Sequence, residues 1–134
     1  SAVAIDGRAL MIEGPPGSGK SSLALSLIDR GAKLVGDDGV TLARKGASLL
    51  ASPPPNIAGC LEVRGVGIAQ FPVISDIPLA LILVLGQQGE RLPQSLARRE
   101  ILGIAIPVLP FDPGSIAPAI RAEIALAVHG LEHS

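Results

Sequence analysis

The sequence predicts an α/β fold in which helices pack on a mixed β-sheet that contains a phosphate-binding P-loop. Short apolar runs separated by turns, two stretches with helical periodicity, and a glycine-rich segment between a strand and a helix lead to this prediction. The chain has 134 residues, which suits one core, so we expect a single domain over 1–134. Phe71 and Phe111 are the only aromatic residues, so Leu, Ile, Val and Ala must build that core.

Net charge and cysteine content argue against several classes of protein. The formal net charge is −1, so no overall field attracts the chain to nucleic acid or to a membrane surface. The longest apolar run, 77–86, is too short to span a bilayer and contains Pro78. The single cysteine, Cys60, excludes an internal disulfide and is typical of a reducing compartment, so we expect a cytoplasmic protein.

The first elements are a hairpin and a helix. The turn pair Asp6-Gly7 between two apolar runs predicts a β-hairpin over 2–13. A helix is expected over 21–30, where apolar residues recur every three to four positions and Gly31 provides a stop. The glycine-rich segment therefore lies between a strand and a helix.

Later segments alternate strands with polar connections. Apolar or alternating patterns predict a strand at 32–35, a hairpin at 40–51 that turns at Lys45-Gly46, β structure at 60–71 and a fully buried strand at 77–85. The polar segment 86–100 is expected to be a loop that leads into a short helix, and 101–110 contains the last strand. An amphipathic helix is expected over 116–130 with Ser115 as its N-cap.

The segment GPPGSGKS, 14–21, matches the pattern GxxxxGK[ST] at every fixed position. Its glycines permit positive φ angles and a close approach of phosphate that a Cβ would block. The following helix directs its positive end toward the anion, Lys20 is placed to bind the β and γ phosphates of ATP, and the Ser21 hydroxyl can bind Mg²⁺. The predicted nucleotide-binding residues are Gly14, Pro15, Pro16, Gly17, Ser18, Gly19, Lys20, Ser21 and Ser22.

Most P-loop enzymes have a Mg²⁺-binding acid at the end of a second apolar strand, and this sequence lacks one at the expected strand. The strand at 77–85 ends in Gly86 without an acid, whereas Asp37 and Asp38 follow another short strand. Adjacent side chains of an extended chain point in opposite directions, so one carboxylate could face the γ-phosphate and its acceptor while the other supports the metal or the structure. A plain Asp-Asp-Gly turn is the alternative interpretation. Glu62 is a further candidate, and its alternative is a solvated strand residue paired with Arg64.

Three strings in this order, GPPGSGKSS, KLVGDD and LEVRGVGI, resemble the catalytic domain of HPr kinase/phosphorylase, in the compact form found in α-proteobacteria. The resemblance runs from about Val3 to the helix after Ser115 and is strongest from Arg8 to Gln70. It implies an ATP- and Mg²⁺-dependent kinase for a serine of HPr, the phosphocarrier of the bacterial sugar phosphotransferase system. The family also reverses this step with inorganic phosphate.

The resemblance also assigns roles by position. It implies the catalytic residues Asp37 as proton acceptor, Lys20 on the phosphates and Arg91 in the string ERLP, and the metal-binding residues Ser21, Glu62 and Asp38. It further implies homo-oligomers and, in longer members, a separate N-terminal domain that we do not expect within 1–134. The loop 110–115 is basic in the family but has no Lys or Arg here, which leaves the reverse reaction open.

Two other functions fit the same P-loop. A small-molecule kinase would need an arginine-rich lid, and 89–100 is the candidate segment. A non-catalytic ATP-binding regulatory module would bind the nucleotide without turnover. A turnover assay with the protein substrate separates these alternatives.

Overall fold

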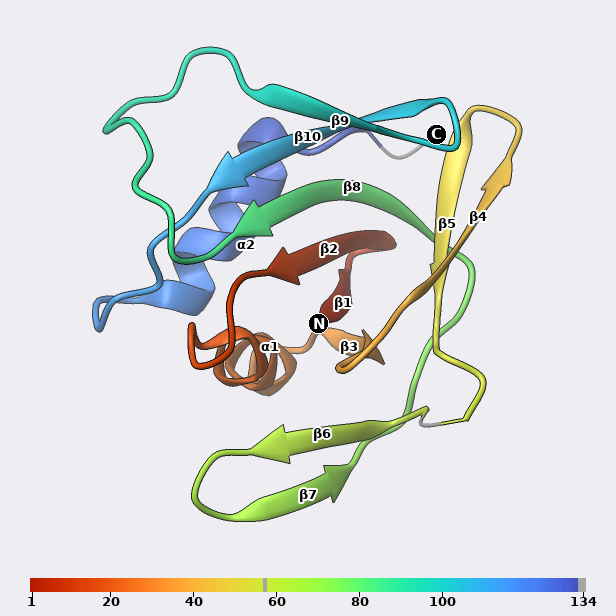
Figure 1. The fold of residues 1–134 in the computed structure, drawn as a ribbon, viewed down its shortest axis with the longest axis vertical. Coiled ribbons are helices and arrows are strands. Elements are labelled where there is room, and N and C mark those ends of the chain that lie inside the picture. The colour runs from red at the N-terminus through yellow and green to blue at the C-terminus, as the bar shows by residue number, and fades with distance from the viewer. Residues whose placement is uncertain (57, 133–134) are drawn as a thin grey trace.

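One large mixed sheet organises the chain (Figure 1). The computed structural model describes residues 1–56 and 58–132. The main sheet contains β1 (Ala2–Ile5), β2 (Arg8–Glu13), β3 (Lys33–Gly36), β4 (Thr41–Lys45), β5 (Ser48–Ser52), β8 (Ile77–Val84), β9 (Ala97–Ile101) and β10 (Ile104–Pro110). A separate two-stranded sheet is formed by β6 (Cys60–Val63) and β7 (Gly67–Gln70), and the helices are α1 (Lys20–Asp29) and α2 (Pro118–His129).

The strand directions bring several carboxyl ends to one edge of the main sheet. Its central order is β3-β1-β2-β8-β10-β9, and β8 is parallel to both β2 and β10. Because β1 is antiparallel to β2 and to β3, the strand β3 runs in the same direction as β2. The segments that follow β3, β2, β8 and β10 therefore leave the same edge, which is where ligands bind in open α/β sheets.

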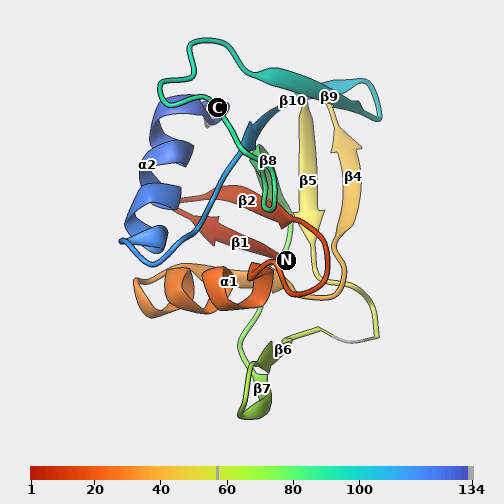
Figure 2. The same cartoon turned by 60° about the vertical axis from the view of Figure 1, so that its left-hand side comes forward.

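The two faces of the sheet are packed against different partners. Leu10 and Leu83 belong to the core cluster that contains the buried residues of α1 and α2. Their neighbours Ala9 and Ile82 point to the opposite face, in a second cluster with Leu49 of β5. Figure 2 shows both helices on one side of the central strands and the β4–β5 hairpin on the other. The helix layer predicted from sequence therefore covers one face, and a hairpin covers the other.

Most predicted elements are present, and the α/β prediction is confirmed. The hairpin over 2–13, the helix after the P-loop, the hairpin that turns at Lys45-Gly46 and the buried strand near 77–85 all form. The segment 60–71 forms the antiparallel β6–β7 hairpin, which lies outside the main sheet in both views. Within the described part of the chain, no helix is long and apolar enough to cross a membrane.

Two predictions about the second half were wrong. The short helix expected at the end of the polar segment 86–100 is instead strand β9, which pairs antiparallel with β10 through a tight turn. Leu102 and Gly103 in that turn have φ values of 51° and 83°, the conformation that two-residue hairpins require. The last helix begins at Pro118 rather than after Ser115, and its N-cap is Ala117. Proline favours the first helical position because it lacks the N–H that would be unpaired there.

Candidate active site

The P-loop forms an open cradle between β2 and α1. Gly17 and Gly19 have φ values of 79° and 100°, and no atom lies within 4 Å of the place where either would have a Cβ. The Lys20 ammonium donates a hydrogen bond to the Gly14 carbonyl oxygen at 2.9 Å, which folds the side chain back over the loop. The backbone therefore leaves room for an anion at the first turn of α1, beside a lysine.

Close packing fixes the start of the P-loop against β8. A Cβ on Gly14 would lie 2.5 Å from the Ser18 hydroxyl oxygen and 3.0 Å from the Leu85 Cβ, so a larger residue does not fit there. The Ser18 hydroxyl is buried and has no hydrogen-bond partner among the described residues. Ser18 therefore faces the loop interior, and the backbone amides rather than this hydroxyl are available to a phosphate.

The Asp37 carboxylate joins three segments of the chain. Its Oδ1 accepts hydrogen bonds from the hydroxyls of Ser21, at 2.8 Å, and Ser1, at 2.7 Å. Its Oδ2 accepts the backbone N–H of Glu62 at 3.3 Å. One acidic side chain at the end of β3 thus holds Ser1, the first turn of α1 and the β6–β7 hairpin.

Asp38 and Glu62 line the same region. One cavity of ≈ 380 Å³ is lined by Lys20, Ser21, Asp37 and Asp38, among others. A second cavity of ≈ 400 Å³ is lined by Lys20, Ser21, Asp38 and Glu62, together with Arg64. The structure therefore brings together five of the residues singled out in the sequence, from three separate motifs.

These carboxylates do not form a metal site by themselves. In the part of the chain that the structure describes, no three His, Cys, Asp or Glu side chains are grouped closely enough to hold an ion. Mg²⁺ in phosphoryl-transfer sites is typically held by one or two carboxylates together with substrate phosphates and water. The Ser21 hydroxyl with nearby carboxylates is a hard oxygen set of that kind, so the residues fit Mg²⁺ that arrives with a nucleotide.

Arg91 is on the other side of the P-loop. It lines a cavity at the carboxyl ends of β8 and β10, together with Phe111 and Arg121, and it does not line the cavities that contain Lys20. In the sheet order, β2 with its P-loop lies between β3 and β8. Asp37 and Arg91 therefore flank the phosphate cradle from opposite sides.

Several polar contacts at the site were missed by sequence reasoning. Arg99 of β9 donates to Glu13, the last residue of β2, at 2.6 Å, and this hydrogen bond raises the pKa of Arg99. Arg121 of α2 donates to the backbone carbonyl oxygens of Asp112 and Pro113. The loop 110–115, which contains no Lys or Arg, therefore has a cation beside it. Arg99 and Glu13 are 86 positions apart in sequence, and no local pattern indicates their contact.

Known proteins resemble this arrangement over most of the chain. A solved structure, the HPr(Ser) kinase/phosphatase from Coxiella burnetii, aligns with a TM-score of 0.78 and 28% identity, covering 94% of this chain and 86% of that one. The HPr kinase/phosphorylase of Chlorobium limicola is 34% identical over 94% of this chain, and that of Clostridium tetani is 36% identical over 92%. This chain spans less than half of those two relatives, 43% and 45% of their lengths.

The sequence profile of one protein family covers nearly the whole chain. The family is described as the HPr serine kinase C-terminal domain, and its profile matches residues 1–129. The match includes the P-loop, the Asp37-Asp38 pair and the β6–β7 hairpin, which are the parts that meet at the site. By the extent of this match, the chain belongs to the HPr serine kinase C-terminal domain family.

Proposed function

We propose that this domain transfers the γ-phosphate of ATP to a serine of HPr, the carrier that the names of its relatives contain. The observation that carries the proposal is the 2.8 Å hydrogen bond between the Ser21 hydroxyl and Asp37. A hydrogen bond of this length places Asp37 beside the P-loop hydroxyl that would bind Mg²⁺, and therefore close to the γ-phosphate and the acceptor serine.

The lysine and the P-loop amides would bind and orient the triphosphate. Lys20 now donates to a backbone carbonyl, and a bound phosphate would offer its ammonium a charged acceptor, which gives a stronger hydrogen bond. Mg²⁺, held through Ser21 with support from Asp38 and Glu62, would neutralise charge on the β and γ phosphates. Positioning of this kind provides most of the catalysis in phosphoryl transfer.

Asp37 is the residue we assign to the acceptor proton. Its Oδ2 has one donor, the Glu62 amide, so this oxygen retains a free lone pair for the serine hydroxyl of the substrate. The donors on Oδ1 hold the carboxylate in one orientation toward the cavity it shares with Lys20. A carboxylate held in one orientation beside the γ-phosphate is the arrangement that general base catalysis needs.

We assign Arg91 to the phosphate chain as well, approaching from the side of β8. A cation at that position would also be available to inorganic phosphate in the reverse reaction, together with Arg121 beside the loop after β10. HPr is the proposed partner, in the cytoplasm, and association of several copies of the domain is part of the same proposal.

Lys20→Ala tests the proposal. The domain is incubated with ATP, Mg²⁺ and purified HPr, transfer is detected as the added mass of a phosphate group, and ATP affinity is measured by calorimetry. Lys20→Ala is expected to lose both ATP binding and transfer, whereas Lys45→Ala, on an exposed strand away from the site, keeps both. Unchanged ATP affinity in Lys20→Ala would refute the assignment. Tight ATP binding without transfer to HPr would instead favour a regulatory module, and phosphate found on a metabolite would favour a small-molecule kinase.

A further inference from the structure

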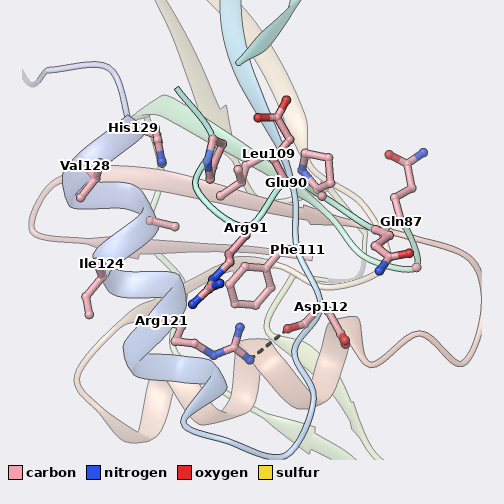
Figure 3. A pocket seen from close by; sticks show the side chains of 16 residues that line it. Gln87, Glu90, Arg91, Leu109, Phe111, Asp112, Arg121, Ile124, Val128 and His129 are labelled. Carbon is pink, nitrogen blue, oxygen red and sulfur yellow. Dashed lines mark hydrogen bonds between the residues drawn. The ribbon is translucent and has the colours of Figure 1, made fainter. Parts of the chain in front are cut away.

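The cavity that Arg91 lines is not explained by the phosphate cradle. It has a volume of ≈ 670 Å³ and lies at the carboxyl ends of β8 and β10, against α2 (Figure 3). This volume is within the range of small-molecule sites, roughly 300 to 1,000 Å³. None of the P-loop residues lines it.

The cavity nevertheless adjoins the P-loop. Gly86, which follows β8 and lines the cavity, is so close to Pro15 that a Cβ on Gly86 would lie 3.2 Å from the proline Cδ. The same edge of the sheet carries both features, because β2 and β8 are parallel neighbours. The cradle and the cavity are therefore neighbours along this edge of the sheet, with Pro15 and Gly86 between them.

The positions of the acidic side chains indicate the direction in which a bound nucleotide lies. Asp37, Asp38 and Glu62 are all on the β3 side of the P-loop, where the γ-phosphate, the metal and the accepting hydroxyl must meet. The rest of the nucleotide has to leave the cradle away from that side, since the acceptor needs access in line with the bond that breaks. Opposite the acids is β8, with the cavity at its end.

The lining of the cavity suits a flat group with an apolar face and polar edges. Leu109, Phe111 and Ala125 form an apolar wall, and Gln87, Arg91 and His129 add polar groups. Figure 3 shows Arg91 and His129 directed into the space between the loop and α2. Arg121 lies over the Phe111 ring at 4.9 Å from its centroid and is occupied by backbone carbonyls, whereas no hydrogen bond of Arg91 is found among the described residues. An apolar wall with a few convergent polar groups is typical of sites for small ligands.

We propose that this cavity binds the nucleoside half of ATP, with the base against the wall of Leu109, Phe111 and Ala125. The inference rests on the proposed function, since it places the triphosphate in the P-loop. It adds the site that distinguishes ATP from a bare polyphosphate.

The test compares ATP with inorganic triphosphate, both with Mg²⁺, by calorimetry. The unmodified domain is expected to bind ATP at least about tenfold more tightly than triphosphate. His129→Trp from α2 and Gln88→Trp from the loop place an indole in the cavity, so they should remove this advantage and leave triphosphate affinity unchanged. Ile120→Trp is the matched control, because Ile120 is exposed on the same helix and does not line the cavity.

The outcomes separate this inference from the proposed function. Equal affinity of the unmodified domain for ATP and triphosphate would overturn the nucleoside site while the P-loop assignment stands. Unchanged ATP affinity in both Trp variants, with unfolding midpoints like that of Ile120→Trp, would overturn it as well. If the domain binds neither ligand, the cradle assignment itself is wrong, and the nucleoside site falls with it.

Discussion

The two sides of the P-loop are held in place by different forces. On the β3 side, Asp37 receives hydrogen bonds from the P-loop helix and from the β6–β7 hairpin, and the neighbouring cavities are lined mainly by polar groups. On the β8 side, the cavity wall contains Leu109, Phe111 and Ala125, which are also members of the main hydrophobic cluster. One side is a polar network at the surface, and the other is an extension of the core.

This difference predicts how each side responds to substitution. Polar substitutions on the β3 side should change chemistry with little loss of stability, because the groups involved are not part of the core. Changes in the wall of the β8 side should alter stability and binding together, since buried apolar side chains contribute roughly 1.5 to 3 kcal/mol each. Three substitutions test this contrast, in order of expected effect.

Asp37→Asn has the largest expected effect. The amide keeps the size of the side chain and an oxygen that can accept from Ser21, but it cannot take a proton from the acceptor serine. Transfer to HPr should fall by roughly 10² to 10⁴-fold, the contribution of a general base, with only a small fall in the unfolding midpoint, because the amide nitrogen cannot accept the exposed hydrogen bond from the Glu62 N–H. Rates from a mass-based transfer assay and thermal unfolding measure the two quantities. Asp76→Asn, at an exposed position away from the cradle, is the control, and full activity of Asp37→Asn would exclude Asp37 as the base.

Gly86→Ala tests the junction between the two sides. Gly86 has a φ of 83°, so alanine is strained there by roughly 1 to 2 kcal/mol, and its Cβ would press on Pro15. We expect lower stability in urea unfolding together with weaker ATP binding. Gly46→Ala is a matched control, because Gly46 has a φ of 62° in a hairpin turn with no atom within 4 Å of a new Cβ. Equal ATP affinity in the two variants would mean that the loop after β8 does not position the P-loop.

Arg99→Ala has the smallest expected effect. The ion pair between Arg99 and Glu13 has a separation of 2.6 Å, but the two side chains are 42% and 35% exposed. Water and salt screen such a pair, so its loss should cost less than about 1 kcal/mol and should matter less at high ionic strength. Urea unfolding of Arg99→Ala and Arg98→Ala at low and high salt measures the difference. A loss well above this limit would show that β9 is an essential tie to the P-loop strand.

Local sequence signals predicted most of the fold, and they failed where pairing with another strand determines the secondary structure. Asp6-Gly7 and Lys45-Gly46 are turn pairs between strand-like runs, and both hairpins form as expected. The string LARRE contains good helix formers, yet pairing with β10 makes Ala97–Ile101 a strand. The pair Leu102-Gly103 between two isoleucines was the available signal for a hairpin turn, although leucine is rare at positive φ. For the last helix, Pro118 was a better marker of the start than Ser115.

The candidate site was predictable to the extent that each motif is local. The P-loop pattern determines the geometry of its own loop. Asp37 follows the short strand that comes directly after the P-loop helix, so it was expected to lie near the P-loop. The hydrogen bond from the Glu62 amide could not be inferred, because the β6–β7 hairpin lies outside the main sheet and its placement is a tertiary event. The separation of Arg91 from Asp37 likewise depends on the strand order, which the sequence of elements does not determine.

The alanines on the hairpin-facing side of the sheet limit how this domain can be altered. Ala2, Ala4 and Ala9 are at most 6% exposed, and they share their cluster with Leu49 of β5. A bulkier residue at any of them would push the whole β4–β5 layer outward, as overpacking does in dense interiors. Mutational libraries for this scaffold therefore have more freedom on the exposed outer surface of β4 than beneath it.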